Sequence, residues 1–384
     1  MKSKKTLVLV LVAALLVSVM GIGASASESE TVKLGFISTI TGSNALNGEY
    51  ALNGFLLAVE EINAAGGILG KEVTYSIADE MSTTEGSVNA LAKLLEDEEI
   101  MAVCGSHMSV YAIAGMQEIT ASGTPYVSNG SSSSVEAEGN PLVWQSRPLD
   151  IYQGVAMAEY AINVHNVQNP AILYSTDSTF VNIMEQTVKA FSERGIEIPE
   201  ENLFAFAESE SNFSNYIAQI MAGDFDCLIL DTSQTSTILI LQQAQAAGLD
   251  MLGIGFNSIA DANVLENAAS AAEGWYSISD WCPAVDTQKG SAFAAAYEEK
   301  YGNLPATSGA YAYDAVYLIK AAMEAAGTTE DKAAINEGFK QIKDLEGATT
   351  TFSYFTENQS LASSLFVAQV SDGVALCVDV VKYR

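Results

Sequence analysis

The sequence predicts an α/β fold in which two successive blocks of strands and helices form two lobes. Short runs rich in apolar and β-branched residues alternate with longer segments whose apolar residues recur at helical spacing. This alternation is typical of strand–helix–strand units, which build a mainly parallel sheet flanked by helices. This alternation extends through residues 31–127 and begins again at residue 151. We therefore expect one sheet in each lobe.

The first block opens with an apolar strand at residues 31–37 and a helix over residues 52–62, which ends at the glycine pair 66–67. The elements expected next are a strand at 73–78, a helix at 87–95, a strand at 101–104, a helix at 110–121 and a strand at 125–127. A loop rich in hydroxyl groups follows at residues 128–134. It is a candidate for binding because it comes directly after a strand.

The second block repeats the pattern. Its expected elements are a helix at 151–164, a strand at 171–174, a helix at 181–194, a strand at 227–230, a helix at 237–248 and a strand at 251–255. The chain then returns to short strands near Trp275 and to helices at 291–301 and 311–326, and it closes with strands at 365–370 and 375–381.

Size and charge narrow the possible functions. The chain has 384 residues, with 49% hydrophobic and 17% charged residues, which suits two packed domains and argues against disorder. Lys and Arg number 17 against 47 Asp and Glu, so the formal net charge is −30. So negative a protein repels phosphate backbones and anionic membrane surfaces, which excludes nucleic acid as an expected partner.

The first residues predict export. Three lysines among the first five residues precede an apolar run at 7–20, which is followed by Ala24-Ser25-Ala26. A basic start, a short apolar run and a small-residue cleavage site are typical of a secretory signal peptide, so we assign residues 1–26 to it and begin the mature chain at Ser27. A lipoprotein would carry a cysteine at the cleavage site, whereas the first cysteine is Cys104. We therefore expect a periplasmic or exported protein.

The four cysteines are widely spaced, and no C-x-x-C pair suggests a metal site. Three of them lie inside strand-like apolar runs, which favours buried thiols over a disulfide framework. A single disulfide stays open as an alternative. The cysteines are Cys104, Cys227, Cys282 and Cys377.

Several segments resemble one known family. Residues 35–42 read GFISTITG, residues 53–70 read NGFLLAVEEINAAGGILG, and residues 103–109 read VCGSHMS. The segments QQAQAAG at 242–248 and AYAYDAV at 310–316 follow in the family's order. Together they resemble the branched-chain amino acid type of periplasmic substrate-binding protein of ABC transporters, which has the periplasmic binding protein type I fold.

The resemblance implies two lobes joined by three crossover segments, with hinges near Arg147, Trp275 and Ala348. It assigns residues 27–146 plus 276–348 to lobe 1 and residues 147–275 plus 349–384 to lobe 2. In such proteins the lobes close around a small ligand and present the closed form to an ABC permease. A monomer is the state that the resemblance implies.

The candidate site follows from the positions of loops, because ligands of α/β sheets sit beyond the carboxyl ends of the strands. Ser109 precedes the helix expected from residue 110, so its hydroxyl can cap that helix while neighbouring N–H groups face a carboxylate. The resemblance implies that Ser109 and Ser132 bind an α-carboxylate and that the backbone of Gly130 meets an ammonium. The alternatives are a plain helix cap for Ser109 and a mobile surface turn for the serine loop.

The ammonium partner departs from the family pattern. Relatives typically use an acid from the second lobe, and the loop at 253–257 contains none. Asp231, at the end of the strand 227–230, is the nearest substitute, because an unpaired buried ammonium is costly. The alternative is that Asp231 caps the following turn.

The resemblance also places Asn47, His107 and Phe180 against the ligand. Asn47 replaces an aromatic residue common in relatives, and His107 replaces an aliphatic one. Both changes make the pocket more polar, which favours a polar amino acid, an amide or another small polar acid. The alternative for His107 is a partly buried histidine outside the pocket.

The sequence also disfavours catalysis. Cys104 and His107 are three residues apart, but the first lies in a strand, where this spacing does not bring two side chains together. The common hydrolase, zinc, phosphate-loop and dinucleotide motifs are missing from the sequence, so no cofactor or metal is expected. The remaining alternative to transport is a sensor that reports a bound amide or organic acid to a membrane receptor.

Overall fold

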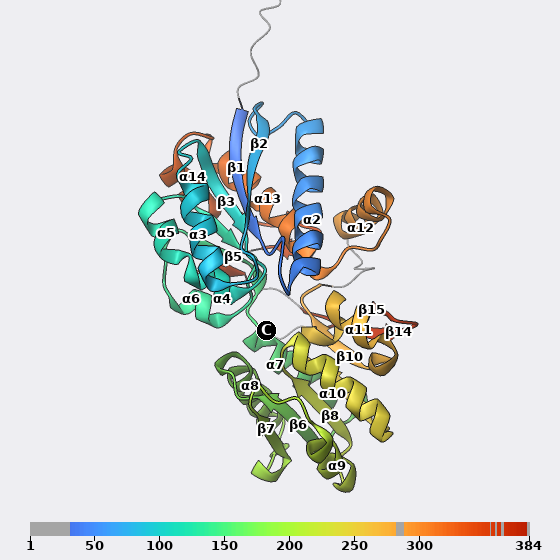
Figure 1. Cartoon of the computed structure of the whole chain (residues 1–384). Helices are drawn as coiled ribbons and strands as arrows, with labels where there is room; N and C mark the ends of the chain where they lie inside the picture. The colour runs from blue at the N-terminus through green and yellow to red at the C-terminus, as the bar shows by residue number, and fades with distance from the viewer. Residues whose placement is uncertain (1–30, 282–287, 354, 358, 362–364, 382–384) are drawn as a thin grey trace, which may run out of the picture.

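The computed structural model describes residues 31–281, 288–353, 355–357, 359–361 and 365–381. Two sheets, each covered by helices, lie one above the other in Figure 1 and are joined by crossing segments. The predicted signal peptide, residues 1–26, and Cys282 lie outside the described residues. Among the helices described, none combines the length and apolar character needed to cross a bilayer.

The first sheet has six strands, all paired in parallel, in the order β13-β5-β4-β3-β1-β2. Its central strands are apolar runs buried on both faces, as expected for a sheet covered by helices on each side. The strands are β1 (Thr31–Ser38), β2 (Glu72–Asp79), β3 (Ile100–Gly105), β4 (Tyr126–Ser128), β5 (Val143–Pro148) and β13 (Ser360–Leu361). We call the part of the molecule built on this sheet lobe 1.

Helices cover both faces of the first sheet (Figure 1). The helices α2 (Ala45–Ala64) and α13 (Thr307–Ala326) pack on the face that carries Phe36 and Cys104. They approach closely at Gly54, where an added Cβ would lie 2.0 Å from the carbonyl oxygen of Gly309. The opposite face packs against α3 (Thr84–Leu95), α4 (Ser109–Ala114) and α5 (Met116–Ser122).

The second sheet has seven strands in the order β15-β14-β10-β9-β8-β6-β7. The five strands from β10 to β7 are parallel, whereas β14 and β15 join antiparallel. The strands are β6 (Pro170–Ser175), β7 (Leu203–Phe206), β8 (Cys227–Asp231), β9 (Leu252–Gly255), β10 (Tyr276–Ser279), β14 (Leu365–Ser371) and β15 (Val374–Val381). We call the part of the molecule built on this sheet lobe 2.

Helices also cover both faces of lobe 2. The face carrying Ile172 and Ile229 packs on α7 (Ile151–His165) and α8 (Ser178–Glu193). The other face packs on α9 (Ser214–Ala222), α10 (Gln234–Ala247) and α11 (Ala262–Ala272). The prediction of an α/β class with mainly parallel sheets is confirmed.

The remaining elements are short or lie at the edges. They are α6 (Ser133–Ala137), α12 (Gln288–Tyr301), α14 (Lys332–Phe339), the one-turn helices η1 (Glu200–Asn202) and η2 (Asn257–Ala260), and the two-stranded sheet of β11 (Leu345–Glu346) with β12 (Thr351–Phe352). α12 packs on α2, and α14 packs on α13, so both helices belong to lobe 1.

Three segments lead from one sheet to the other. The first lies between Pro148 and Ile151, the second between Ser279 and Gln288, and the third between Leu361 and Leu365. The first follows Arg147, near which one hinge is expected.

The second and third crossings fall later in the chain than the positions expected near Trp275 and Ala348. β10 pairs with β9 and β14 in the second sheet, although the sequence analysis began a lobe 1 segment at residue 276. β13 pairs with β5 in the first sheet, although residues 349–384 were assigned to lobe 2. Strands of two to four residues carry too little pattern to reveal their pairing partner.

The structure also bears on the helix predicted over 110–121 and on the cysteines predicted to be buried. The helix predicted over 110–121 is interrupted at Gly115, where an added Cβ would lie 2.0 Å from Cδ1 of Leu91. Cys104 and Cys227 are buried thiols in β3 and β8, as predicted. Cys377 in β15 is only half-buried, and its sulfur lies 3.7 Å from the carbonyl oxygen of Asp379.

Candidate functional site

A cleft of about 390 Å³ lies between the two lobes. Its lobe 1 wall comes from the loops after β3 and β4, and its lobe 2 wall comes from the loops after β6, β7, β8 and β9. The carboxyl ends of the parallel strands of both sheets therefore face it, as ligand sites in such folds require. The lobe 1 lining includes His107, Met108, Ser109, Ser131 and Ser132, and the lobe 2 lining includes Asp177, Phe180, Glu208, Thr232, Gln234, Phe256 and Asp261.

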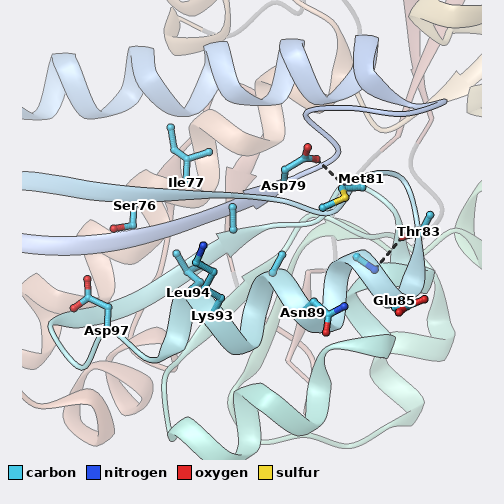
Figure 2. Close-up of a pocket in the computed structure, with 13 residues that line it drawn as sticks. Ser76, Ile77, Asp79, Met81, Thr83, Glu85, Asn89, Lys93, Leu94 and Asp97 are labelled. Atoms are coloured by element: carbon cyan, nitrogen blue, oxygen red, sulfur yellow. Dashed lines mark hydrogen bonds between the residues drawn. The ribbon is translucent and has the colours of Figure 1, made fainter.

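Two other cavities are larger but fit a ligand site less well. One of about 710 Å³ lies on the outer edge of the first sheet, between β2 and α3, as Figure 2 shows. It is lined by lobe 1 residues alone and contains none of the residues predicted to bind a ligand. A second, of about 520 Å³, lies between α2 and α11 and is mainly apolar. The cleft between the lobes is therefore the candidate site.

The structure brings Ser109, Gly130 and Ser132 together. The backbone N–H of Ser132 donates a hydrogen bond to Oγ of Ser109 over 3.0 Å. An added Cβ at Gly130 would lie 2.6 Å from that same oxygen, so a glycine is needed there. The two predicted loops thus form one continuous polar wall.

Ser109 does not cap a helix, contrary to the alternative interpretation. It is the first residue of α4, whose N-cap is Met108, so its hydroxyl is oriented toward the neighbouring loop instead. Ser132 is the N-cap of α6, with Oγ accepting from the N–H of Ser134 over 3.2 Å. Only 6% of Ser132 is exposed, so the serine loop is packed and is not a mobile surface turn.

His107 lines the cleft and is half-buried. Burial, followed by the nearby positive charge of Arg147, lowers the pKa of the imidazole to about 3. Nδ1 of His107 has no hydrogen-bond partner within the described residues. The ring is therefore neutral at physiological pH and contributes no positive charge to the cleft.

Arg147 also lines the cleft, but its charge is already matched. The guanidinium forms a buried ion pair with Asp280 through Nε. Nη1 donates to the carbonyl oxygen of Asn129 over 3.2 Å, and the ring of Tyr311 lies 5.2 Å from the guanidinium carbon. Arg147 thus serves the packing of the crossover region more than it offers a free cation to a ligand.

Asp231 lies behind the cleft wall, at the end of β8. It is fully buried, and neither carboxyl oxygen has a hydrogen-bond partner within the described residues. Burial, and then the neighbouring charge of Asp150, raise the pKa of Asp231 well above its ordinary value. The capping alternative is wrong, since Ser233 caps α10. The next residue, Thr232, reaches the cleft lining, whereas Asp231 does not.

Asn47 occupies a different place from the one expected. It is buried in α2, and its Nδ2 donates to Oδ2 of Asp261 in lobe 2 over 3.3 Å. Nε2 of Gln234 donates to the same oxygen over 3.4 Å. Asn47 therefore bridges the lobes at the end of the cleft and is not among the residues that line it.

The sequence analysis missed three acids of lobe 2 that line the cleft. Asp177 caps α8, Asp261 caps α11, and Oε1 of Glu208 accepts hydrogen bonds from Ser233 and Ser236. Asp177 follows shortly after the end of β6, so the strand-end rule applied to lobe 2 would have found it, whereas Glu208 follows β7, a strand that the sequence did not predict. Asp261 lies beyond the one-turn helix η2, outside the 253–257 loop that was inspected.

An aromatic wall completes lobe 2. Phe180, predicted to face the ligand, packs edge-to-face on Phe256, with ring centroids 5.7 Å apart and an interplanar angle of 87°. Both rings line the cleft. The cleft therefore combines hydroxyl groups in lobe 1 with rings, carboxylates and amide side chains in lobe 2, and it can hold a small zwitterionic molecule.

Comparison with known proteins agrees with this architecture. A family model described as periplasmic binding protein matches residues 31–375. The Leu/Ile/Val-binding protein homolog 3 of Brucella melitensis is 25% identical over 338 residues, covering 87% of this chain and 90% of the relative. A leucine-, isoleucine-, valine-, threonine- and alanine-binding protein of Pseudomonas aeruginosa is 24% identical over 310 residues, covering 79% of this chain and 80% of the relative.

Solved structures resemble the whole described fold. The branched-chain amino acid transporter substrate-binding protein LivJ of Streptococcus pneumoniae, in complex with isoleucine, superposes with a TM-score of 0.80 at 26% identity, covering 92% of this chain and 99% of the other. The leucine-binding protein LivK of Thermotoga maritima gives a TM-score of 0.80 at 24% identity, covering 91% and 99%. A solute-binding protein of R. palustris in complex with benzoate gives 0.77 at 18% identity.

Proposed function

Because the chain belongs to the periplasmic binding protein family, we propose that it captures one amino acid in the cleft between its lobes and delivers it to an ABC permease. The observation that carries this proposal is that Ser109 and Ser132 line the cleft from lobe 1 and are joined by a hydrogen bond, with Gly130 buried against Ser109. The Pseudomonas aeruginosa relative binds leucine, isoleucine, valine, threonine and alanine according to its name, and the Brucella melitensis relative is named a homolog of a Leu/Ile/Val-binding protein. We therefore propose an amino acid as the ligand, without assigning its side chain from these relatives.

In this proposal the hydroxyls of Ser109 and Ser132 donate to the α-carboxylate of the ligand. The carbonyl oxygen of Gly130 already accepts from Nε2 of Gln145 over 3.1 Å, and its second lone pair is available to the ammonium. Asp261 offers carboxyl oxygens to the cleft from lobe 2, whereas the raised pKa of Asp231, which lies behind the cleft wall, favours its neutral form. No bond is made or broken, so the site binds without catalysis.

Closure of the lobes is the second part of the proposal. The ligand contacts one wall from each lobe, so it stabilises the closed arrangement more than the open one. Asn47 and Asp261 already join the lobes by a hydrogen bond at the end of the cleft. The closed protein then docks on the permease as a monomer. Export precedes these steps, guided by residues 1–26.

The test is a thermal-shift and calorimetric screen of the mature chain against the twenty amino acids, small amides and organic acids. A ligand at about 100 times its Kd stabilises the folded protein by about 2.7 kcal/mol. Ser109→Ala and Ser132→Ala should each raise the Kd at least tenfold, while Ser270→Ala, an exposed serine of α11, should leave it unchanged. Failure of every α-amino acid to bind would overturn the proposal.

A further inference from the structure

Charges in the cleft are unequally distributed between the lobes. Arg147, whose charge is matched by Asp280, lines the cleft with a neutral His107 and with Asp150, whose pKa burial raises to about 7. Lobe 2 contributes three acids to the lining, Asp177, Glu208 and Asp261, and no basic residue. Asp261 accepts hydrogen bonds from Asn47, Gln234 and the N–H of Asn263, and burial raises its pKa. Asp177 and Glu208 are therefore the two acids that the single ammonium of a zwitterionic ligand would not both match.

Glu208 is held by hydrogen bonds to only one of its two carboxyl oxygens. Ser233 and Ser236, both near the start of α10, donate their hydroxyls to Oε1. Oε2 accepts no hydrogen bond from the described residues, and Glu208 forms no ion pair with them. Two donors thus hold the carboxylate toward the cleft without neutralising it.

Asp177 is held in a similar way. Its Oδ1 accepts from the N–H of Thr179 over 2.9 Å at the start of α8. The other oxygen, Oδ2, has no partner within the part of the chain that the structure describes. Asp177 and Glu208 follow neighbouring strands, β6 and β7, and both line the cleft. They therefore present two anionic oxygens at one end of the site.

Thr232 is an independent sign of a ligand at the same end. It is fully buried in the cleft wall, and its Oγ1 has no hydrogen-bond partner within the described residues. It directly precedes Ser233, which holds Glu208. A buried hydroxyl without a partner costs about 1–3 kcal/mol, so a polar group of a ligand is expected to satisfy it.

Two aromatic rings offer an apolar surface for the aliphatic part of a ligand side chain. Phe180 and Phe256 line the cleft beside these polar groups. Aromatic faces pack well on a methylene chain and attract a cation within about 6 Å of the ring centroid. The combination of rings, carboxylates and an unsatisfied hydroxyl fits an apolar stem that ends in a positive group.

We propose that the ligand carries a second positive charge, and that Glu208 and Asp177, with Thr232, bind it: the protein takes a cationic amino acid of the lysine or arginine class. This inference rests on the proposed function, because it presumes that the α-carboxylate lies against Ser109 and Ser132. The α-ammonium and the side-chain cation then face the acids of lobe 2. An apolar amino acid of the same length leaves Glu208 and Asp177 without a partner.

The experiment compares ligands by titration calorimetry on the mature chain. L-lysine and L-arginine are measured against L-norleucine, which matches the lysine side chain without its terminal ammonium. We expect at least one of the cationic ligands to bind tenfold or more tightly than norleucine. Raising the salt concentration should weaken that binding more than it weakens the binding of norleucine, because salt screens the additional pairing between exposed charges.

Variants connect the preference to the named residues. Glu208→Gln and Asp177→Asn should each weaken binding of the cationic ligand about tenfold and leave norleucine unchanged. Glu200→Gln, an exposed acid of η1 outside the cleft, is the matched control. If leucine or norleucine binds more tightly than lysine and arginine, or if both variants bind the cationic ligand normally, the inference falls while the proposed function stands. If no amino acid binds at all, the proposed function itself fails.

Discussion

Arg147 and Asp280, 133 residues apart in the chain, form a buried ion pair that ties the first crossover segment to the second. Arg147 lies at the end of β5, and Asp280 follows β10 directly. Tyr311 of α13 completes the cluster, with its hydroxyl donating to the carbonyl oxygen of Asp280 over 2.8 Å. The region between the lobes therefore has a fixed polar centre, which confines bending to the backbone around it.

Removing one partner of this ion pair should be costly. Arg147→Met leaves the Asp280 carboxylate buried without a partner, and we expect the free energy of unfolding to fall by about 3–5 kcal/mol in urea titrations. The double variant Arg147→Met/Asp280→Leu should recover most of that loss, because apolar residues of similar size replace both charges. Equal stability of the parent protein and Arg147→Met would contradict the assigned role.

The bridge from Asn47 to Asp261 should support ligand binding and not stability. Asn47→Ala removes the hydrogen bond between α2 of lobe 1 and Asp261, the N-cap of α11 in lobe 2. We expect the Kd of the bound amino acid to rise about two- to tenfold, which corresponds to a hydrogen bond of about 0.5–1.5 kcal/mol. The midpoint of unfolding without ligand should move little. Asn89→Ala, at an exposed position of α3, is the control. An unaltered Kd for Asn47→Ala would contradict the role of this hydrogen bond in ligand binding.

Glu80 should make the stability of the protein depend on pH. The side chain is fully buried, with Oε1 accepting from Ser106 over 2.7 Å and from Ser87 over 3.3 Å. Burial raises the pKa of Glu80 from 4.5 to about 7. The folded protein therefore holds a proton that the unfolded chain releases, and the free energy of unfolding falls as the pH rises from about 4.5 through about 7.

Glu80→Gln tests this dependence because the amide keeps the acceptor and removes the titration. The variant should exceed the parent in stability by up to about 3 kcal/mol at pH 8 and match it near pH 4. Denaturant titrations across that range measure the difference. Glu72→Gln, an exposed acid of β2, should leave the slope unaltered. A parent protein whose stability is flat between pH 4.5 and 8 would count against the buried carboxyl.

Cys104 and Cys227 should resist thiol reagents in the folded protein. Both are fully buried, and burial raises the pKa of each thiol, so little thiolate forms at pH 8. Peptide mass spectrometry after labelling should find both unmodified without denaturant and fully modified in it. Rapid labelling of either residue in the native protein would show that its strand opens readily.

Much of the fold follows from the sequence because buried strands are continuous apolar runs. β1, β3 and β8 were predicted within one or two residues, since each carries apolar residues on both faces. The interruption at Gly115 was missed because it arises from packing against Leu91, a residue of another helix. The edge strand β13 was missed because two residues carry no periodicity.

The candidate site, too, could be predicted only in part from the sequence. Ser109, Gly130 and Ser132 were found because they follow strands and match a known motif, and the structure brings them together. Asn47 was placed against the ligand by local similarity, but its partner, Asp261, lies 214 residues away in the sequence. Contacts between residues so far apart in the sequence depend on how the two lobes pack together, and a local sequence pattern carries no information about that packing. Glu208 was missed because it follows β7, a four-residue strand that the sequence did not predict.

The position of α13 has a consequence for how the chain acquires its shape during synthesis. The strands β1 to β5 are complete by residue 148, but α13, which covers the face bearing Phe36 and Cys104 together with α2, spans Thr307–Ala326. The strands from β6 to β10 are contiguous between residues 170 and 279 and can assemble earlier on their own helices. A growing chain therefore carries a partly uncovered apolar sheet from residue 148 until residue 307 is made, and it needs protection from aggregation until α13 emerges.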